Sequence, residues 1–306
     1  MLVHLDTDFG GDPDDACALG LLLAWPEVEV IGVTTTLEHD GKRAGCAQYV
    51  LGLARRSDIP VVAGAEATLT GNRFECTWGD DRYWPESFAA LPTLPGAATD
   101  ALTTAIDAGA TIIAIGGLTN LAELELAQPG VLAGAPIVAM GGWVDPLAAG
   151  LPPWGPERDF NIQCDTRAAE VVAASGADLT LALLPITAEV HLRGRDLPRL
   201  RTAGVLGRLF ARQAEVYALD KDRAALVAGH EALPADLLNF HWDPVAAAVA
   251  VGWPGTTVEE AHLRTEFQGD ALAFVRDQSG PAIRILTAVD ADAFAETWLQ
   301  AVDRLP

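Results

Sequence analysis

Near its N-terminus the chain places five aspartates between two apolar segments, within residues 4–16. The apolar run Val3 to Leu5 predicts a short strand, Gly10-Gly11 predicts a turn, and Ala16 to Trp25 predicts an apolar helix. A chain that begins with strand, turn and helix is directed towards a layered α/β fold, with the acidic turn at one edge of a sheet.

The aspartates take different positions in this unit. Asp8 is expected at the carboxyl end of the strand, and Asp14 and Asp15 in the first turn of the helix. Asp12 is expected to cap that helix ahead of Pro13, because a carboxylate accepts from free N–H groups and proline tolerates the first helical position. In open α/β sheets this edge is where ligands bind.

The density of carboxylates predicts a metal site. Clustered carboxylates repel one another, which raises their pKa values unless a cation is present. A hard divalent cation with oxygen ligands would hold Asp8 and Asp15 ionised together. One carboxylate in a first helical turn could merely complement the helix dipole, which is worth only ~0.3–1 kcal/mol. Asp6, at the strand end, is expected to be structural.

Strands and helices alternate along the rest of the chain. Buried strands are predicted at residues 28–36, 60–63, 111–115, 136–140 and 179–184. Helices are predicted at residues 42–53, from 99 or 100 to 108, from 120 onwards, and at 166–175. This alternation predicts an open, mostly parallel α/β sheet with helices on both faces.

The C-terminal part reads differently. Residues 196–240 look helical, and Asp243-Pro244 repeats the arrangement of cap and proline before an apolar helix at 245–251. Residues 258–286 alternate in hydrophobicity, which predicts a small antiparallel edge of the sheet. Residues 290–305 are predicted to form a terminal helix.

Composition limits the classes of partner. The 306 residues are half apolar and contain no Pro/Gly/Ser-rich linker, so we expect a single domain over residues 1–306. Net charge is −22, with Lys42 and Lys221 as the only lysines. Such a surface repels phosphate backbones and anionic lipid, so we expect neither a nucleic-acid partner nor a membrane partner.

The cysteines and the N-terminus favour a cytoplasmic protein. The cysteines are scattered and lack Cys-x-x-Cys spacing, which favours reduced thiols over disulfides: Cys17, Cys46, Cys76 and Cys164. The start, Met-Leu-Val-His-Leu-Asp, has no basic segment typical of a signal peptide. No uninterrupted apolar run reaches the ~18 residues of a transmembrane helix.

The segment Asp6 to Ala16 resembles the signature of the inosine–uridine type nucleoside hydrolases, in the variant with extra residues before the Asp-Asp pair. Further stretches match in the order and spacing of that family: Gly32-Val33-Thr34-Thr35, Pro60-Val61-Val62-Ala63-Gly64, Gly117-Leu118-Thr119-Asn120-Leu121, Met140-Gly141-Gly142, Asp159-Phe160-Asn161-Ile162 and Trp242-Asp243-Pro244. The likeness covers most of the chain, ending near residue 250.

The resemblance implies a calcium site and a catalytic base. It assigns Asp8, Asp15, Asp243 and the backbone carbonyl of Thr119 as Ca²⁺ ligands, and Asp8 as the base that activates water. Calcium takes ~6–8 oxygens, which leaves room for waters and two ribose hydroxyls. Taken alone, Thr119 and Asp243 could each be a helix N-cap.

The resemblance also implies a ribose site and an assembly. It has Asp14 accept from the ribose 2′-hydroxyl, while Asn161 and Asp159 hold the 3′- and 5′-hydroxyls. Without the resemblance, Asp159 and Asn161 would read as polar loop residues. Members of the family are usually homodimers or homotetramers, so a homo-oligomer is expected by analogy.

Several positions depart from the family pattern, mostly where the base would bind. Pro153 stands where the family often has Asn, and Asp159 replaces a Glu. Trp242 replaces the histidine before the late calcium aspartate, Trp78 begins a Trp-Gly-Asp where many members have His-Gly, and His39 replaces an Asn. We expect Trp78, Trp242 and His39 to contact the base, although the tryptophans could equally be core aromatics; stacking on a base contributes ~1–3 kcal/mol.

These departures do not settle how the departing base is protonated. An indole N–H does not transfer a proton at neutral pH, so Trp242 cannot protonate a departing base. Either His39 assists departure, or the substrate carries a base that needs no acid; His241 is expected to point away.

Two other functions compete with ribonucleoside hydrolysis. Asp-x-Asp after a strand also suits an aspartate-nucleophile phosphatase with magnesium, but the chain has few lysines to hold a phosphate. A calcium-dependent ribose- or nucleoside-binding protein of the same fold, without leaving-group chemistry, is the non-enzymatic alternative. Release of reducing sugar from a panel of nucleosides would distinguish the last from a hydrolase.

Overall fold

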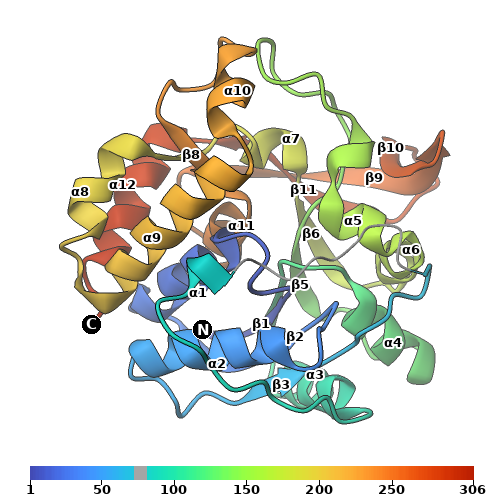
Figure 1. The fold of residues 1–306 in the computed structure, drawn as a ribbon. Helices are drawn as coiled ribbons and strands as arrows, with labels where there is room; N and C mark the ends of the chain where they lie inside the picture. The colour runs from blue at the N-terminus through green and yellow to red at the C-terminus, as the bar shows by residue number, and fades with distance from the viewer. Residues whose placement is uncertain (72–80) are drawn as a thin grey trace.

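The protein is built on one large twisted sheet, seen edge-on in Figure 1, in a computed structural model that describes residues 1–71 and 81–306. Nine strands form the sheet in the order β10-β9-β11-β6-β5-β4-β1-β2-β3. Their bounds are β1 Leu2–Thr7, β2 Glu29–Thr35, β3 Val61–Ala63, β4 Thr111–Ala114, β5 Pro136–Met140, β6 Asp178–Ala182, β9 Thr256–Gln268, β10 Ala271–Arg276 and β11 Ala282–Val289.

The predicted pairing is confirmed. Strands β3, β2, β1, β4, β5, β6 and β11 run parallel in that order across the sheet. Strands β9 and β10 are antiparallel and form the small edge predicted near the C-terminus.

Helices cover both faces of the sheet, as predicted (Figure 1). Their bounds are α1 Asp14–Ala24, α2 Lys42–Leu53, α3 Ala97–Asp107, α4 Thr119–Ala127, α5 Phe160–Cys164, α6 Thr166–Ala174, α7 Leu184–Thr187, α8 Leu197–Leu200, α9 Gly204–Asp220, α10 Arg223–Ala228, α11 Trp242–Ala250 and α12 Ala291–Val302. Short 3-10 turns are η1 Asp81–Tyr83, η2 Pro156–Arg158 and η3 Gly194–Asp196. In the described parts of the chain no helix has the length and apolar character needed to span a membrane.

The two faces have separate apolar cores, because side chains alternate along each strand. In and just after β4, Ile113 and Ile115 pack with α1, α9, α11 and α12, while Ile112 and Ala114 pack with α3, α4 and α6. Helix α1 is buried along most of its length. The strand ends between these cores are therefore held rigidly.

One predicted helical region was partly wrong. Within residues 196–240, Leu237–Phe240 forms strand β8, which pairs antiparallel with β7, His191–Arg193. Phe240 is fully buried. A strand this short offers too few residues to show a period of two against the helical pattern before it.

Candidate active site

A cavity of about 530 Å³ opens at the carboxyl edge of the parallel strands. Residues that follow β1, β4 and β6 and the last residue of β5 reach it: Asp8, Ile115, Leu184 and Met140. The rest of its lining is Gly11, Asp12, Asp14, Asp15, Arg43, Tyr83, Trp154, Arg158, Asp159, Phe160, Asn161, Tyr217, Asp220, Lys221, Arg223, Trp242 and Asp243. The aspartate-rich turn lies where the strand–turn–helix pattern predicted a binding edge.

Three buried carboxylates converge in this cavity. Oxygen atoms of Asp14, Asp15 and Asp243 lie within 4.8 Å of one another, and Asp8 lines the same space. Burial raises the pKa of each of the three well above its usual value, and repulsion from neighbouring aspartates raises it further. Such a cluster stays ionised only beside a cation, so the donor set fits a hard metal ion.

The helices bring this cluster together. Asp14 and Asp15 open α1, as predicted, and Asp243 lies in the first turn of α11, which packs against α1. The cap assignments were wrong: Pro13 and His241 hold the N-cap positions, without side-chain cap bonds. Asp12 instead accepts a 2.5 Å hydrogen bond from Asn239, which occupies the carboxylate that was expected to cap the helix.

Asp8 lies one residue beyond β1, beside a buried arginine. Arg43 donates through Nη1 to the carbonyl oxygens of Asp8 and Phe9, and through Nε to that of Leu37 at 2.7 Å. Burial raises the pKa of the Asp8 carboxyl, and the charge of Arg43 opposes that rise. Arg43 was not recognised from the sequence, because its role depends on a contact across the sheet edge.

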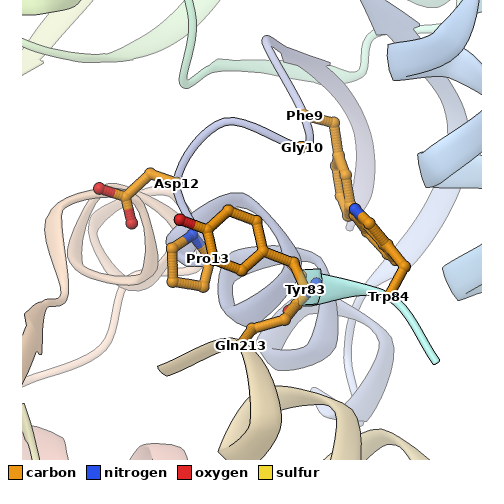
Figure 2. A pocket seen from close by; sticks show the side chains of 8 residues that line it. Phe9, Gly10, Asp12, Pro13, Tyr83, Trp84 and Gln213 are labelled. Atoms are coloured by element: carbon orange, nitrogen blue, oxygen red, sulfur yellow. The ribbon is translucent and has the colours of Figure 1, made fainter. Parts of the chain in front are cut away.

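Aromatic side chains brace the turn that carries Asp12. Figure 2 shows Tyr83 beside Pro13 and Trp84 beside Phe9, with Gln213 completing the enclosure. The rings of Phe9 and Trp84 lie 6.5 Å apart between centroids. This packing holds the loop between β1 and α1 against residues of η1 and α9.

Thr119 is not brought to the cavity. It is fully buried as the first residue of α4, and its hydroxyl donates to Asp165 at 2.8 Å. The carbonyl of a first-turn residue points into its own helix, whereas the unsatisfied groups at that end are N–H groups. Ile115, four positions earlier, lines the cavity, and its carbonyl oxygen accepts from Asn161 at 3.0 Å.

Asp159 and Asn161 both line the cavity, but Asp159 also has a structural role. Its carboxylate accepts from the backbone N–H groups of Gly142 at 2.6 Å and Ile162 at 3.2 Å, which caps α5. Burial raises its pKa to about 7. Asn161 donates to the carbonyl of Met140 as well as to that of Ile115, so its amide is fixed at the ends of β4 and β5.

An aromatic group stands beside the carboxylates. Trp242 stacks on Phe240 with ring centroids 4.4 Å apart, and Trp154 lies 6.1 Å from Trp242. Trp154 was not singled out in the sequence, although it lies in the proline-rich loop 143–158. Trp78, predicted to contact the base, lies outside the described residues.

The predicted histidine is not at the cavity. The described cavity lining contains no histidine. His39 lies in the connection between β2 and α2. There the Glu38 carboxylate accepts from the N–H groups of His39 and Ala44, which holds the chain at the start of α2. His241 packs against Trp298, 4.7 Å between ring centroids, and points away as expected.

Comparison with known proteins identifies the family. The family model for inosine-uridine preferring nucleoside hydrolases matches residues 3–296. The chain is 35% identical over 214 residues to a pyrimidine-specific ribonucleoside hydrolase, RihA, of Shewanella sp. strain MR-4, covering 65% of this chain and 64% of that protein. It is 34% identical over 216 residues to RihA of Salmonella agona strain SL483, covering 66% of each. The matched region thus spans slightly less than two thirds of these relatives.

Solved structures confirm the fold. A plant nucleoside hydrolase matches with a TM-score of 0.81 at 24% identity, over 99% of this chain and 98% of the other. A purine-preferring ribonucleoside hydrolase from Gardnerella vaginalis matches with a TM-score of 0.81 at 19% identity and the same coverage. The sheet order, the carboxylate cluster at its carboxyl edge and the nearly full-length family match agree, and the chain belongs to the inosine-uridine preferring nucleoside hydrolase family.

Proposed function

We propose that the protein hydrolyses the N-glycosidic bond of a ribonucleoside or related ribosyl compound, releasing the base and ribose. The convergence of Asp14, Asp15 and Asp243 with Asp8 in one cavity is the observation that carries this proposal. N-glycoside cleavage passes through an oxocarbenium-like sugar, which a surplus of carboxylates stabilises.

The ion proposed for this site is calcium. Asp8, Asp15 and Asp243 would hold it with hard oxygen donors, and the described lining contains neither cysteine nor histidine. We propose the Ile115 carbonyl as the further protein donor, in place of Thr119, because Ile115 lines the cavity. When bound, the ion supplies a fixed positive charge that polarises a water molecule and orients the ribose diol.

Each side chain has a separate proposed role in catalysis or in ribose binding. Asp8 takes a proton from the water that attacks C1′ of the sugar, and Asp14 accepts from the 2′-hydroxyl. Asn161 contacts the 3′-hydroxyl and Asp159 the 5′-hydroxyl. Because both oxygens of Asp159 already accept from backbone N–H groups, we expect its hold on the sugar to be weaker than that of a free carboxylate.

A panel of ribosides tests the proposal. Purified calcium-loaded protein is incubated with uridine, inosine, other nucleosides and p-nitrophenyl riboside, and reducing sugar is measured. We expect sugar release from at least one of them. Binding of nucleosides without any sugar release would instead support the nucleoside-binding alternative, which the lack of a histidine in the described lining keeps open.

Assembly and location complete the proposal. By analogy with the family we propose a homodimer or homotetramer, which light scattering of the purified protein measures. We also propose a cytoplasmic protein, since buried free thiols, at Cys17, Cys46 and Cys164, suit a reducing compartment.

A further inference from the structure

Besides Arg43, three further cationic side chains line the same cavity as the carboxylates: Arg158, Lys221 and Arg223. Several surface arginines elsewhere pair with carboxylates, as Arg199 does with Asp303 and Arg284 with Asp178. Among the ion pairs of the described residues, none includes any of the three. In a chain of net charge −22, unpaired cations gathered at one cavity need an explanation from the site itself.

Arg223 is held in place by neutral partners. Its Nη2 donates to Asn239 Oδ1 at 3.1 Å, and its guanidinium carbon lies 5.1 Å from the ring centroid of Phe240 and 5.3 Å from that of Tyr217. Its Nε is buried without a hydrogen-bond partner. The guanidinium is thus held in place while its charge has no anionic partner among the described residues.

Arg158 stands at the other end of the same aromatic group. Its guanidinium carbon lies 5.5 Å from the ring centroid of Trp154, which in turn lies 5.7 Å from that of Phe240. Arg158 and Arg223 therefore bracket the aromatic group of Trp154, Phe240 and Trp242. Since Trp242 directly precedes Asp243, this group begins where the proposed sugar site ends.

The nearby acids are already engaged. Asp220 pairs with Arg82 at 2.6 Å and accepts from the Tyr83 hydroxyl at 3.0 Å. Asp12 accepts from Asn239, the residue that separates it from Arg223. Lys221 lies 5.5 Å from the Tyr217 ring centroid, which adds a further positive charge on the Arg223 side.

We infer that the substrate's aglycone is a planar heterocycle carrying a negative charge, which stacks on Trp154 and Trp242 while Arg158, Lys221 and Arg223 hold its anionic substituent. This inference rests on the proposed ribosyl hydrolysis. The aromatic rings bind planar surfaces, and guanidinium groups bind carboxylates through charge-assisted hydrogen bonds.

Nicotinic acid riboside is the probe that isolates this charge. When water attacks C1′, the C1′–N bond breaks and its electron pair returns to the ring nitrogen, which changes from pyridinium to neutral pyridine. The proton of the water passes to Asp8, so no acid is needed at the base. Nicotinamide riboside reacts identically but bears a neutral amide where the other bears a carboxylate.

The test compares kcat/KM for the two ribosides. We expect the carboxylated one to be favoured ~10- to 100-fold, as one or two charge-assisted hydrogen bonds imply. Arg223→Gln, and separately the exposed rim variant Arg158→Gln, should bring the ratio towards one. The control Arg201→Gln, which removes a surface arginine paired with Glu215, should keep it.

Three results would overturn the inference: equal efficiencies for the two ribosides, a ratio unmoved in both cavity variants, or preference for uridine 5′-monophosphate over uridine without preference for the carboxylate. Failure of the proposed hydrolysis is separate, because it abolishes sugar release from p-nitrophenyl riboside too. In that case calorimetry of nicotinate and nicotinamide with the calcium-loaded protein decides the inference, and equal binding rejects it.

Discussion

Arg43 and Asp8 are joined through the backbone: the Arg43 guanidinium donates to the carbonyl oxygen of Asp8. The same side chain reaches the carbonyls of Phe9 and Leu37. A planar fork of donors thus ties the loop after β1 to the start of α2, and fixes the main chain on which the proposed base is carried.

Arg43→Lys should therefore destabilise the fold. Arg43 reaches these carbonyls through two different nitrogens, whereas a lysine carries all its donors on one, so at least one carbonyl would lose its partner. An unsatisfied buried acceptor costs ~1–3 kcal/mol. We expect a loss of ~2–4 kcal/mol in the free energy of unfolding, measured by urea denaturation. The matched exposed change, Arg56→Lys, should cost less than ~1 kcal/mol. Equal effects of the two changes would contradict the role given to Arg43.

The carboxylate cluster predicts linked loss of metal and activity. Asp8→Asn or Asp243→Ala should bind calcium poorly, measured by calorimetry, and hydrolyse ribosides ~10²–10⁴-fold more slowly. Asp58→Asn, which changes an exposed aspartate paired with Arg56, serves as control. Full activity in protein shown to be metal-free would exclude the calcium site as the basis of hydrolysis.

The proposed contact of Asp14 with the ribose 2′-hydroxyl predicts selectivity for ribose. A 2′-deoxynucleoside leaves buried polar partners unpaired, which costs ~1–3 kcal/mol. We expect kcat/KM for 2′-deoxyuridine to fall ~10- to 100-fold below that for uridine. If the two substrates react equally well, Asp14 does not hold the 2′-hydroxyl.

The position of His39 predicts that it is not the acid for the leaving group. His39→Ala should change hydrolysis of uridine and of p-nitrophenyl riboside by the same factor, because the second leaving group needs no proton. Steady-state rates on the two substrates give this ratio. A selective loss on uridine would restore His39 to the role considered from the sequence.

His4 predicts a pH dependence of stability. Burial lowers its pKa from 6.5 to about 4, so between these values the unfolded chain binds a proton that the folded chain does not. The stabilisation of the fold by uncharged His4 is therefore fully present above pH 6.5, and it is lost as the pH falls towards 4. Lowering the pH from 7 to 5 should therefore reduce the free energy of unfolding by roughly 2 kcal/mol.

Urea denaturation at both pH values measures this contribution. The decrease in stability should be smaller in His4→Gln than in the parent, while His262→Gln, at an exposed histidine, should leave it unchanged. An identical decrease in the His4 variant would rule out His4 as its source.

Much of the fold was predictable because its signals are local. Apolar strands alternating with helices specify a parallel sheet, and Asp14 and Asp15 lie in the first turn of α1 as expected. Strand β8 escaped prediction because its pairing with β7 is a tertiary contact. The capping role expected of Asp12 failed because Asn239, far away in sequence, competes for its carboxylate.

The site was predictable in its carboxylates but not in its cations. Clustering or a motif marks the aspartates in the sequence: Asp8, Asp15 and Asp243. No such pattern marks Arg43, Arg158 and Arg223, which look like ordinary surface arginines. Their significance comes from tertiary contacts: Arg43 is buried against backbone carbonyls, and Arg158 and Arg223 lie over aromatic rings. None of the three belongs to an ion pair of the described residues. Thr119, expected from the resemblance to supply a carbonyl, lies in the first turn of α4, whereas Ile115 just after β4 lines the cavity.

Helix α1 lies between α11 and α12, and the Trp298 indole of α12 donates to the Cys17 carbonyl of α1 at 3.1 Å. Both helices that pack on α1, Trp242–Ala250 and Ala291–Val302, lie far from it in the sequence. Until α11 packs on α1, Asp14 and Asp15 lack Asp243 as a neighbour and the apolar residues of α1 stay uncovered. Contacts between such sequence-distant segments slow folding. The carboxylate cluster is therefore assembled by the same long-range packing that buries α1.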